Sequence, residues 1–544
     1  MYLGRYPRNR LLSEYLESIL ASNGNRPSIV RLENIHELCF LMHLLIIVTI
    51  PSLRYKMAFR LLSKSRYLTG LQCSRYIWIQ FHEPENIPAT DEVTQHIFDQ
   101  GHEVGYLAKK LFTGGIDVSQ DTFMGNIKQT QKLLKERKLL FEAGIMAGKL
   151  YSRVDVLAPA DDDQWDIFEV KSSTNIQDVH IEDIAFQRHC CQKAGLEIRN
   201  CYLVLINNRY VRSGEIDPEE LFTVHDVTDK VAESSIGIED RIQEIINVIL
   251  QDNSPEMIIG PHCRDPYECP MTDCWEHIPE DSVFTLYWNG KKAFDMYDAG
   301  IINITDIPEE YKLNAKQLIQ KSALLNGEIH IEKESIREFL NTLEYPLYYL
   351  DFETIGPAIP LFDNSRPYQN VPFQYSLHVV QKERAEPVHY SYLHKGPGDP
   401  RPGFLADLKK VMGDSGSVIA YNKGFEEGCL RDSAEACPEY AEWAENVNNR
   451  MVDLLTPFSS FHYYHPSQKG SASLKKVLPA ITGTGYDDLD ISDGQIASMT
   501  YLAANYGDVP EEEKLIVFKN LEEYCGRDTE GMIWIIERLR KLSK

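Results

Sequence analysis

Apolar and polar positions follow two different periods through the first half of the chain. Apolar side chains recur at helical spacing in residues 91–112: Val93, Ile97, Val104, Leu107 and Leu111. Residues 149–159 and 165–173 alternate as strands do, and the turn-forming run ADDDQ between them predicts a hairpin. Residues 181–195 then predict a helix closed by a glycine, and residues 200–207 a buried strand.

The second half begins with a polar, helical stretch that has few strand signals, residues 281–340. A β-rich region follows, with strands predicted at residues 345–353, 373–381, 387–394 and 416–422, and the chain ends in a helical region. Strands first and alternating elements later predict an α/β domain with a mixed sheet.

A chain of 544 residues is too long for one core, so two to four domains are expected. We expect an α/β protein with an uncertain N-terminal extension at residues 1–57, a first domain at 58–280, a helical connector at 281–340 and a second domain at 341–544.

One segment, LCFLMHLLIIVTI at residues 38–50, is strongly apolar. Its 13 residues are short for a membrane span, so a buried helix is favoured over a membrane or signal role. A further alternative is that residues 1–56 precede a natural start at Met57. No membrane association is expected, and eleven cysteines, an odd number, indicate a reducing cytoplasmic protein without a disulfide framework.

The net charge of −25 argues against a protein that simply coats DNA, because phosphate contacts require Lys and Arg. It is compatible with an enzyme that gathers carboxylates around metal ions.

Three charged residues form a first constellation on the predicted hairpin. Glu169 and Lys171 are two apart and share a strand face, and the hairpin partner can bring Asp155 beside them. Two carboxylates can hold Mg²⁺, and the lysine can orient water and offset phosphate charge. Gln187 on the next helix can steady the lysine or the water. The alternative is a surface hairpin with a salt bridge.

A second constellation follows the apolar run YPLYYLDFETIGP. Asp351 and Glu353 share one strand face, Glu426 follows a buried strand, and Tyr524 and Asp528 lie four apart on one helix face. Four acids from three segments can hold two metal ions, and the tyrosine can position the attacking water. The alternatives are a solvated strand end and a packing role for the tyrosine.

Four cysteines suggest a thiolate site. Cys263, Cys269 and Cys274 have the spacing C-x5-C-x4-C, and Cys73 is the best candidate for a fourth ligand. Thiolates favour iron–sulfur clusters or zinc, while a metal-free site remains the third alternative.

The motifs RVDVLAP, WDIFEVKSS and AFQRHCCQKAG resemble the RecB-like branch of the PD-(D/E)XK nuclease superfamily, which has a restriction-endonuclease-like fold. The resemblance implies a metal or positioning residue on the upstream helix, where FDQGHEVGYLA offers His102 or Glu103. One cysteine before this core and three after it resemble the iron–sulfur members of that branch. This implies a structural 4Fe–4S cluster, with Zn²⁺ as the alternative.

The order D-x-E, YNxxFE and Y-x3-D resembles the DEDD exonuclease superfamily in its tyrosine variant, with the DnaQ-like ribonuclease H fold. Glu426 stands where that family normally has Asp, which alters the geometry of ligation. The whole chain resembles an uncharacterised bacterial family that fuses the two nuclease domains.

The resemblance implies metal-dependent hydrolysis of nucleic acid with Mg²⁺ or Mn²⁺ at both sites. The favoured activity is an exonuclease on single-stranded DNA, ahead of RNA, in repair or in defence against foreign DNA. A helicase partner is conceivable, because the sequence has no phosphate-binding G-x-x-x-x-G-K loop of its own. The alternative function is a catalytically impaired protein that binds nucleic acid or a partner and keeps a structural cluster. The oligomeric state stays open.

Overall fold

The structure is a computed structural model that describes residues 61–118 and 122–544. The apolar segment 38–50 and Met57 therefore lie outside the described residues. The stretch Leu62–Lys544 forms one compact unit. Within the described ranges, no helix combines the length and the apolar character needed to cross a membrane.

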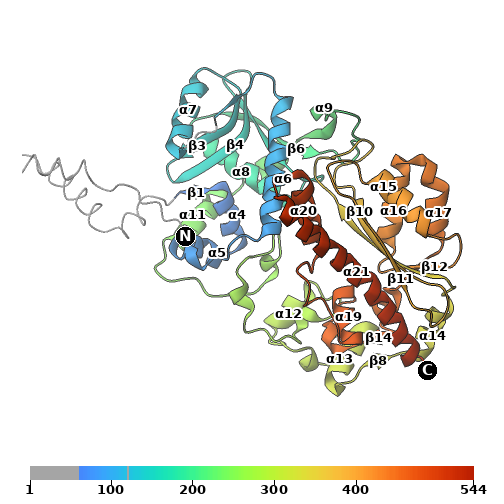
Figure 1. The fold of residues 1–544 in the computed structure, drawn as a ribbon. Helices are drawn as coiled ribbons and strands as arrows, with labels where there is room; N and C mark the ends of the chain where they lie inside the picture. The colour runs from blue at the N-terminus through green and yellow to red at the C-terminus, as the bar shows by residue number, and fades with distance from the viewer. Residues whose placement is uncertain (1–60, 119–121) are drawn as a thin grey trace, which may run out of the picture. The chain divides into compact units, whose positions relative to one another are not determined.

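A seven-stranded mixed sheet organises the first part of the chain (Figure 1). Its order is β2-β3-β4-β5-β6-β7, with the short β1 paired to the start of β4. The strands are β1 (Leu62–Ser63), β2 (Ile116–Asp117), β3 (Leu140–Ala147), β4 (Leu150–Pro159), β5 (Trp165–Lys171), β6 (Ile198–Ile206) and β7 (Phe222–Asp226). β4 and β5 pair antiparallel, which confirms the predicted hairpin.

β5 and β6 run parallel and are joined by helix α8 (Asp178–Lys193). α8 packs on the sheet through Ile184, Ala185 and Phe186, which are fully buried in the core with Val154 and Leu203. The other helices of this part are α4 (Lys64–Gln72), α5 (Ser74–His82), α6 (Glu92–Ala108), α7 (Phe123–Lys135), α9 (Pro218–Leu221), α10 (Thr228–Ser234) and α11 (Ile238–Ile249). The helices predicted near residues 91–112 and 181–195 are thus confirmed as α6 and α8.

The connector is helical, as its sequence predicts, apart from one short strand. It contains α12 (Lys292–Asp298), α13 (Ala315–Asn326), β8 (His330–Ile331) and α14 (Lys333–Asn341). β8 pairs antiparallel with β14 (Tyr463–Tyr464), so the connector is bound to the part of the chain that follows it. The domain limits at residues 280 and 340 stay predictions.

A five-stranded sheet of order β11-β10-β9-β12-β13 organises the last part. Its strands are β9 (Leu347–Ile355), β10 (Val371–Val380), β11 (Val388–Leu393), β12 (Ser417–Ala420) and β13 (Met451–Asp453). β9, β10 and β11 form an antiparallel meander, whereas β12 runs parallel to both β9 and β13. The predicted mixed sheet and the α/β class are therefore confirmed.

Helices cover both faces of this sheet (Figure 1). Even-numbered residues of β9, such as Leu350 and Phe352, pack with α15 (Arg401–Val411), α16 (Gly424–Ala436) and α17 (Ala441–Asn449). Leu347 and Tyr349 belong to the core on the other face. Because strand side chains alternate, Asp351 and Glu353 lie on that second face.

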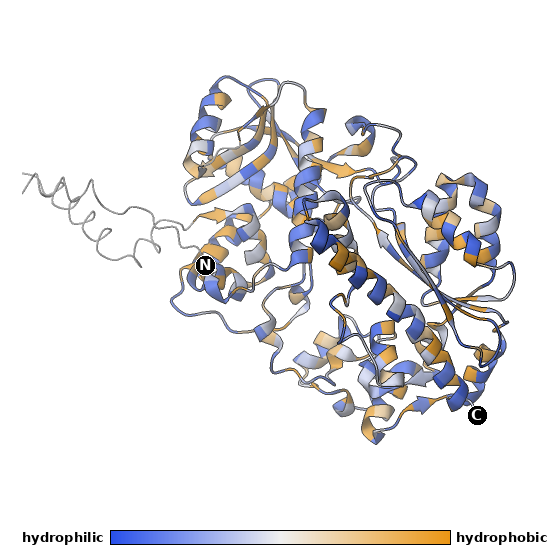
Figure 2. Cartoon of the chain, in the orientation of Figure 1, coloured by the Kyte–Doolittle hydropathy of each residue, from blue (hydrophilic) through white to orange (hydrophobic). Residues whose placement is uncertain are grey.

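The second face is covered by α19 (Leu474–Thr482), α20 (Gly494–Tyr506) and the long α21 (Glu511–Leu542). The short α18 (Thr456–Ser459) precedes them. The hydropathy colouring shows apolar residues of α21 interleaved with hydrophilic ones (Figure 2). α21 therefore buries one side against β9 and β10, and carries Asp528 to the two strand acids.

Candidate functional site

Four carboxyl groups meet on the face of the second sheet that α21 covers. Asp351 and Glu353 come from β9, Glu426 from the first turn of α16 and Asp528 from α21. Glu353, Glu426 and Asp528 are all at most 7% exposed. The structure therefore brings together all four acids that the sequence singles out in this half.

Burial raises the pKa of every member of this group, and repulsion from neighbouring acids adds to the shift of Asp351, Glu353 and Glu426. Burial, with the charges of Asp528 and the neighbouring acids, holds the pKa values of Asp351 and Glu353 well above their usual range. The pKa of Glu426 is raised to about 8, mainly by burial, and that of Asp528 to about 6 for the same reason. Four acids this close cannot all ionise without a compensating cation.

The donor chemistry of the cluster fits a hard divalent cation. Carboxylate oxygens are the ligands that Mg²⁺ and Mn²⁺ prefer. Glu426 Oε2 is buried and has no hydrogen-bond partner among the described residues, which is costly for a polar atom unless a ligand satisfies it. The longer Glu side chain at this position thus still reaches the other acids.

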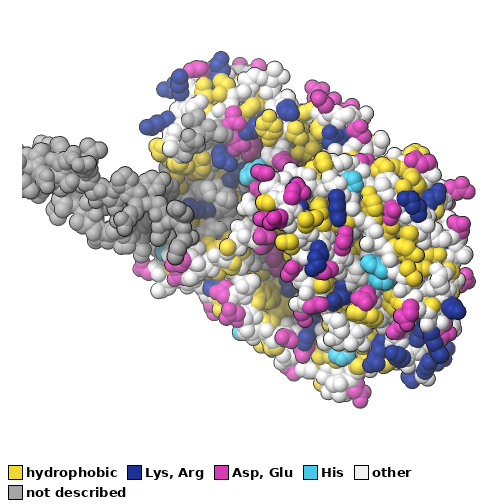
Figure 3. Space-filling view, viewed as in Figure 1, with side chains coloured by type: hydrophobic (Ala, Val, Ile, Leu, Met, Phe, Trp, Pro, Cys, Tyr) yellow, Lys and Arg dark blue, Asp and Glu magenta, His cyan; other side chains and the backbone are white. Residues whose placement is uncertain are grey.

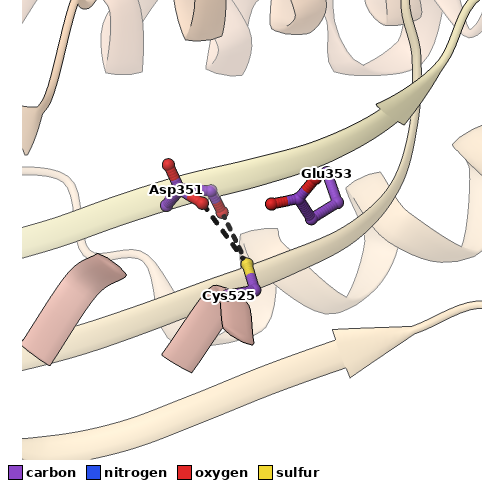
Figure 4. Close-up of side chains that lie close together, drawn as sticks. All are labelled: Asp351, Glu353 and Cys525. Atoms are coloured by element: carbon purple, nitrogen blue, oxygen red, sulfur yellow. Dashed lines mark hydrogen bonds between the residues drawn. The ribbon is translucent and has the colours of Figure 1, made fainter. Parts of the chain in front are cut away.

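Cys525 joins the cluster from α21 (Figure 4). Its Sγ lies with carboxylate oxygens of Asp351 and Glu353 in a group whose ligand atoms are all within 4.8 Å of one another. The thiol donates to Asp351 Oδ2 at 3.5 Å and to the Asp351 carbonyl at 3.8 Å. Burial and the neighbouring acids raise the pKa of Cys525 well above its usual range, so it acts as a neutral donor that orients Asp351.

Two tyrosines and a lysine border the acids. Tyr524 is 4% exposed, and burial together with Asp528, Glu353 and Asp351 raises its pKa. Tyr486 donates a short hydrogen bond from its hydroxyl to Asp528. The Lys475 ammonium lies 5.8 Å from the centre of the Tyr524 ring, and its charge lowers the pKa values of Glu353 and Asp528.

A separate aspartate supports the turn that leads to Glu426. Asp453 Oδ1 accepts the backbone N–H groups of Asn422 and Leu455, both at 2.9 Å. Asn422 has a left-handed backbone with φ of 69°, a conformation that Asn tolerates better than most residues. This turn aims the first turn of α16 at the cluster.

The first constellation is also assembled, around Glu169. Lys171 Nζ donates to Glu169 Oε1 at 2.7 Å, and Gln187 Nε2 donates to Glu169 Oε2 at 2.6 Å. Asp183, four residues before Gln187 on α8, accepts from Lys171 at 2.5 Å and from Gln187 at 3.1 Å. Glu169, Asp183 and Gln187 are nearly fully buried.

Asp155 and a second lysine complete this first cluster. Asp155 Oδ2 accepts the backbone N–H of Val170 at 2.9 Å, which ties the hairpin strands together. Lys64 Nζ lies 2.7 Å from Glu169 Oε1 and 3.9 Å from both Asp155 Oδ1 and Asp183 Oδ2. Burial lowers the Lys64 pKa, but the three carboxylates outweigh it and raise that pKa overall. The carboxylates of Asp155, Glu169 and Asp183 are suitable ligands for a divalent cation. In this structure the ammonium groups of Lys64 and Lys171 balance their negative charge.

The two candidates on α6 lie differently. His102 lines a cavity of about 350 Å³ together with Asp155, Arg153 and Glu142. Glu103 lines an adjoining depression, which His102 also borders, together with Leu107 and Ile359, and is not among the residues around the Asp155 cavity. Both side chains are exposed.

The four cysteines converge although 190 residues separate Cys73 from Cys263. Gln72 Nε2 donates to the carbonyls of His262 and Tyr267, which fastens the end of α4 to the cysteine loop. Cys73 Sγ accepts the N–H of Tyr76 at 3.4 Å, and Cys274 Sγ accepts from Arg75 at 3.2 Å. Such donors stabilise thiolates and cluster ligands.

Burial raises the pKa of Cys269 to about 11, with smaller contributions from Cys73, Cys263 and Cys274. The four sulfurs are thus close neighbours. Among the described residues, however, no three of them have ligand atoms all within 4.8 Å of one another. Around one tetrahedral zinc, sulfurs lie about 3.8 Å apart, given Zn–S bonds of about 2.3 Å. The geometry of the described residues therefore does not by itself assign a metal to the four sulfurs.

Sequence reasoning missed five residues of these sites. Asp183 has a recognisable signal, since it lies one helical turn from Gln187. Cys525 and Lys475 sit beside motif residues but carry no pattern of their own. Lys64 and Tyr486 reach the clusters only through tertiary folding, from helix α4 and from the loop before α20.

The comparisons with known proteins match parts of the chain. The profile of a domain of unknown function, DUF2779, matches residues 348–473, a range that includes Asp351, Glu353 and Glu426. Uncharacterized protein MG366 of Mycoplasma genitalium is 27% identical over 223 residues, 38% of this chain and 33% of that protein. Its homologue in Mycoplasma pneumoniae is 27% identical over 209 residues, 34% of this chain and 31% of that protein.

Uncharacterized protein UU173 of Ureaplasma parvum is 26% identical over 332 residues, 55% of this chain and 47% of that protein. The chain thus spans less than half the length of the curated relatives it matches. Neither the domain description nor these names states an activity.

Proposed function

We propose that this chain is a metal-dependent nuclease with two centres, one RecB-like with an iron–sulfur cluster and one DnaQ-like. The observation that carries the proposal is the cluster of Asp351, Glu353, Glu426 and Asp528. Burying four mutually repelling carboxyls costs stability, and a cation-binding role accounts for that cost.

Mg²⁺ or Mn²⁺ held by these four acids would supply an activated water and offset charge on the scissile phosphate. The chain's own groups have separate tasks. The Tyr524 hydroxyl orients the attacking water, Cys525 holds Asp351, and Tyr486 holds Asp528. Lys475 attracts the phosphodiester to the acids.

In the first centre, Asp155, Glu169 and Asp183 are the cation ligands, and Lys171 orients the water. Gln187 fixes the Glu169 carboxylate, and Lys64 is available to neutralise phosphate charge. Cys73, Cys263, Cys269 and Cys274 hold a structural 4Fe–4S cluster that joins the start and the end of this domain. We propose single-stranded DNA as the substrate, hydrolysed from an end.

The test is a cleavage assay on end-labelled single- and double-stranded DNA and RNA. The protein is purified without oxygen, assayed with Mg²⁺ or Mn²⁺ against EDTA, and its visible absorbance is recorded. We expect stepwise, EDTA-sensitive shortening of single strands by a brown protein. Failure of an intact, cluster-loaded preparation to cleave any substrate would refute the nuclease and favour a binding protein.

A further inference from the structure

A cavity of about 530 Å³ lies between the connector and the second domain. Tyr287 and Trp288 of the connector line it on one side, and Tyr421, Asn422 and residues 470–474 on the other. Its size falls in the range of small-ligand sites. The lining combines aromatic rings with serine hydroxyls and backbone amides, which is the chemistry of a nucleotide site.

Trp288 is exposed to solvent, and the preceding residue, Tyr287, is held in place by hydrogen bonds. It is 87% exposed and has a left-handed backbone with φ of 51°, unusual for a bulky residue. The backbone of Tyr287 is fixed by Gln320 Oε1, which accepts its N–H at 2.8 Å, and by Gln317 Nε2, which donates to its carbonyl at 2.9 Å. An exposed indole ring on a residue with a strained backbone favours a ligand-binding role for Trp288.

The opposite wall offers groups for a phosphate. Ser473 at the N-cap of α19 makes no side-chain capping hydrogen bond, so its hydroxyl does not satisfy the first backbone amides of that helix, and Ser473 and Leu474 line the cavity. Gly470 approaches the connector so closely that a Cβ would lie 2.4 Å from the Thr285 carbonyl. Only glycine permits this close contact between the cavity wall and the connector.

The cavity borders the carboxylate cluster. Leu474 lines it, and the next residue, Lys475, interacts electrostatically with Glu353 and Asp528. Asn422 lines it too, and its backbone begins the turn into α16, which carries Glu426. Acidic and basic side chains are interspersed over the face of the molecule seen in Figure 3.

We propose that this cavity binds one nucleotide of a single-stranded nucleic acid. The base stacks on Trp288, its phosphate lies at the start of α19, and the neighbouring phosphodiester reaches the carboxylate cluster. The inference rests on the proposed nuclease function and adds a substrate subsite to it. It also assigns the connector a role in substrate binding, because Trp288 belongs to the connector.

The experiment measures binding in EDTA, where hydrolysis is absent. Fluorescein-labelled twelve-residue oligo(dT) and oligo(rU) are titrated by fluorescence anisotropy against the full chain. Trp288→Ala should weaken binding about tenfold, because stacking on an aromatic ring is lost, and Trp288→Phe should restore most of it. Tyr390→Ala, which removes an exposed ring on the edge strand β11, is the matched control and should bind as the unsubstituted chain does.

A second readout uses the indole itself. Oligonucleotide binding should quench tryptophan fluorescence of the unsubstituted chain, and Trp288→Phe should lose that quenching. A loss of affinity for either polymer supports the inference, and the polymer affected more identifies the preferred sugar. Undiminished affinity and quenching in the Trp288 variants would overturn it. Failure of the nuclease proposal is separate, since it appears as absent cleavage with Mg²⁺ while the binding result still decides the subsite.

Discussion

Divalent cations should bind the second carboxylate cluster with release of protons, and the affinity should therefore rise with pH. Ligation requires the ionised carboxylate. With a pKa of about 8, Glu426 carries a proton in about nine of ten molecules at pH 7. The proton on Glu426 alone weakens Mg²⁺ binding about tenfold at pH 7 and about a hundredfold at pH 6, relative to pH 9. Asp351 and Glu353, whose pKa values are also raised, add to this release.

The sign follows from the direction of the shifts. A raised carboxyl pKa keeps the group neutral at neutral pH, so raising the pH through about 8 frees Glu426 to bind the cation, and the gain ends above that pH. Asp528, with a pKa of about 6, is already mostly ionised at pH 7 and contributes little there.

The assay is calorimetric titration of Mg²⁺ in buffers of different ionisation enthalpy, between pH 6 and pH 9. Using a Glu169→Gln background removes a central carboxylate of the first cluster. Glu426→Gln should release about one proton fewer at pH 7 than the background protein. Glu442→Gln, on the exposed side of α17, is the matched control and should change nothing. Heats that do not depend on the buffer, with equal affinity at pH 6 and pH 8, would show that the acids are ionised without a cation and refute the reasoning.

Three further outcomes are expected. Lys171→Ala and Asp351→Asn should each abolish cleavage by one centre and leave the other, and cleavage that survives in the double variant would refute the enzyme. Cys73→Ser should lose the visible absorbance, most of the iron and several degrees of melting temperature, whereas Cys201→Ser, at a buried core position, should keep the cluster. Tyr486→Phe removes a donor that lowers the pKa of Asp528, so the acid limb of the pH–activity profile should move upward by about one pH unit, and an unmoved limb would contradict that role.

The second site could be predicted closely because its signals are local. Strand alternation puts Asp351 and Glu353 on one face of β9, and helix geometry fixes the last acid relative to Tyr524. The hairpin of β4 and β5 was equally readable, since a turn-forming run separates two alternating segments. Each of these predictions depends on residues within about ten positions of one another.

Contacts between residues far apart in the sequence could not be predicted from local patterns. Lys64 contacts Glu169 from 105 positions away, and nothing in the sequence around it marks a charged residue destined for a carboxylate cluster. The pairing of β8 with β14 joins two-residue strands that are too short to produce an alternating pattern. The connector therefore reads as an independent helical linker, whereas the structure binds it to the second domain.

The two clusters balance their carboxylate charge in different ways, and this difference separates them experimentally. In the first, Lys64 and Lys171 neutralise the acids, and the pKa values of both lysines are raised by those acids, so both remain ammonium groups through neutral and mildly alkaline pH. In the second cluster, bound protons neutralise Asp351, Glu353 and Glu426 instead. Raising the pH from 6 to 8 therefore strengthens cation binding at the second cluster and leaves the first unchanged. Cleavage that requires less Mg²⁺ as the pH rises comes from the second centre, and cleavage with a constant requirement comes from the first, without any substitution in the chain.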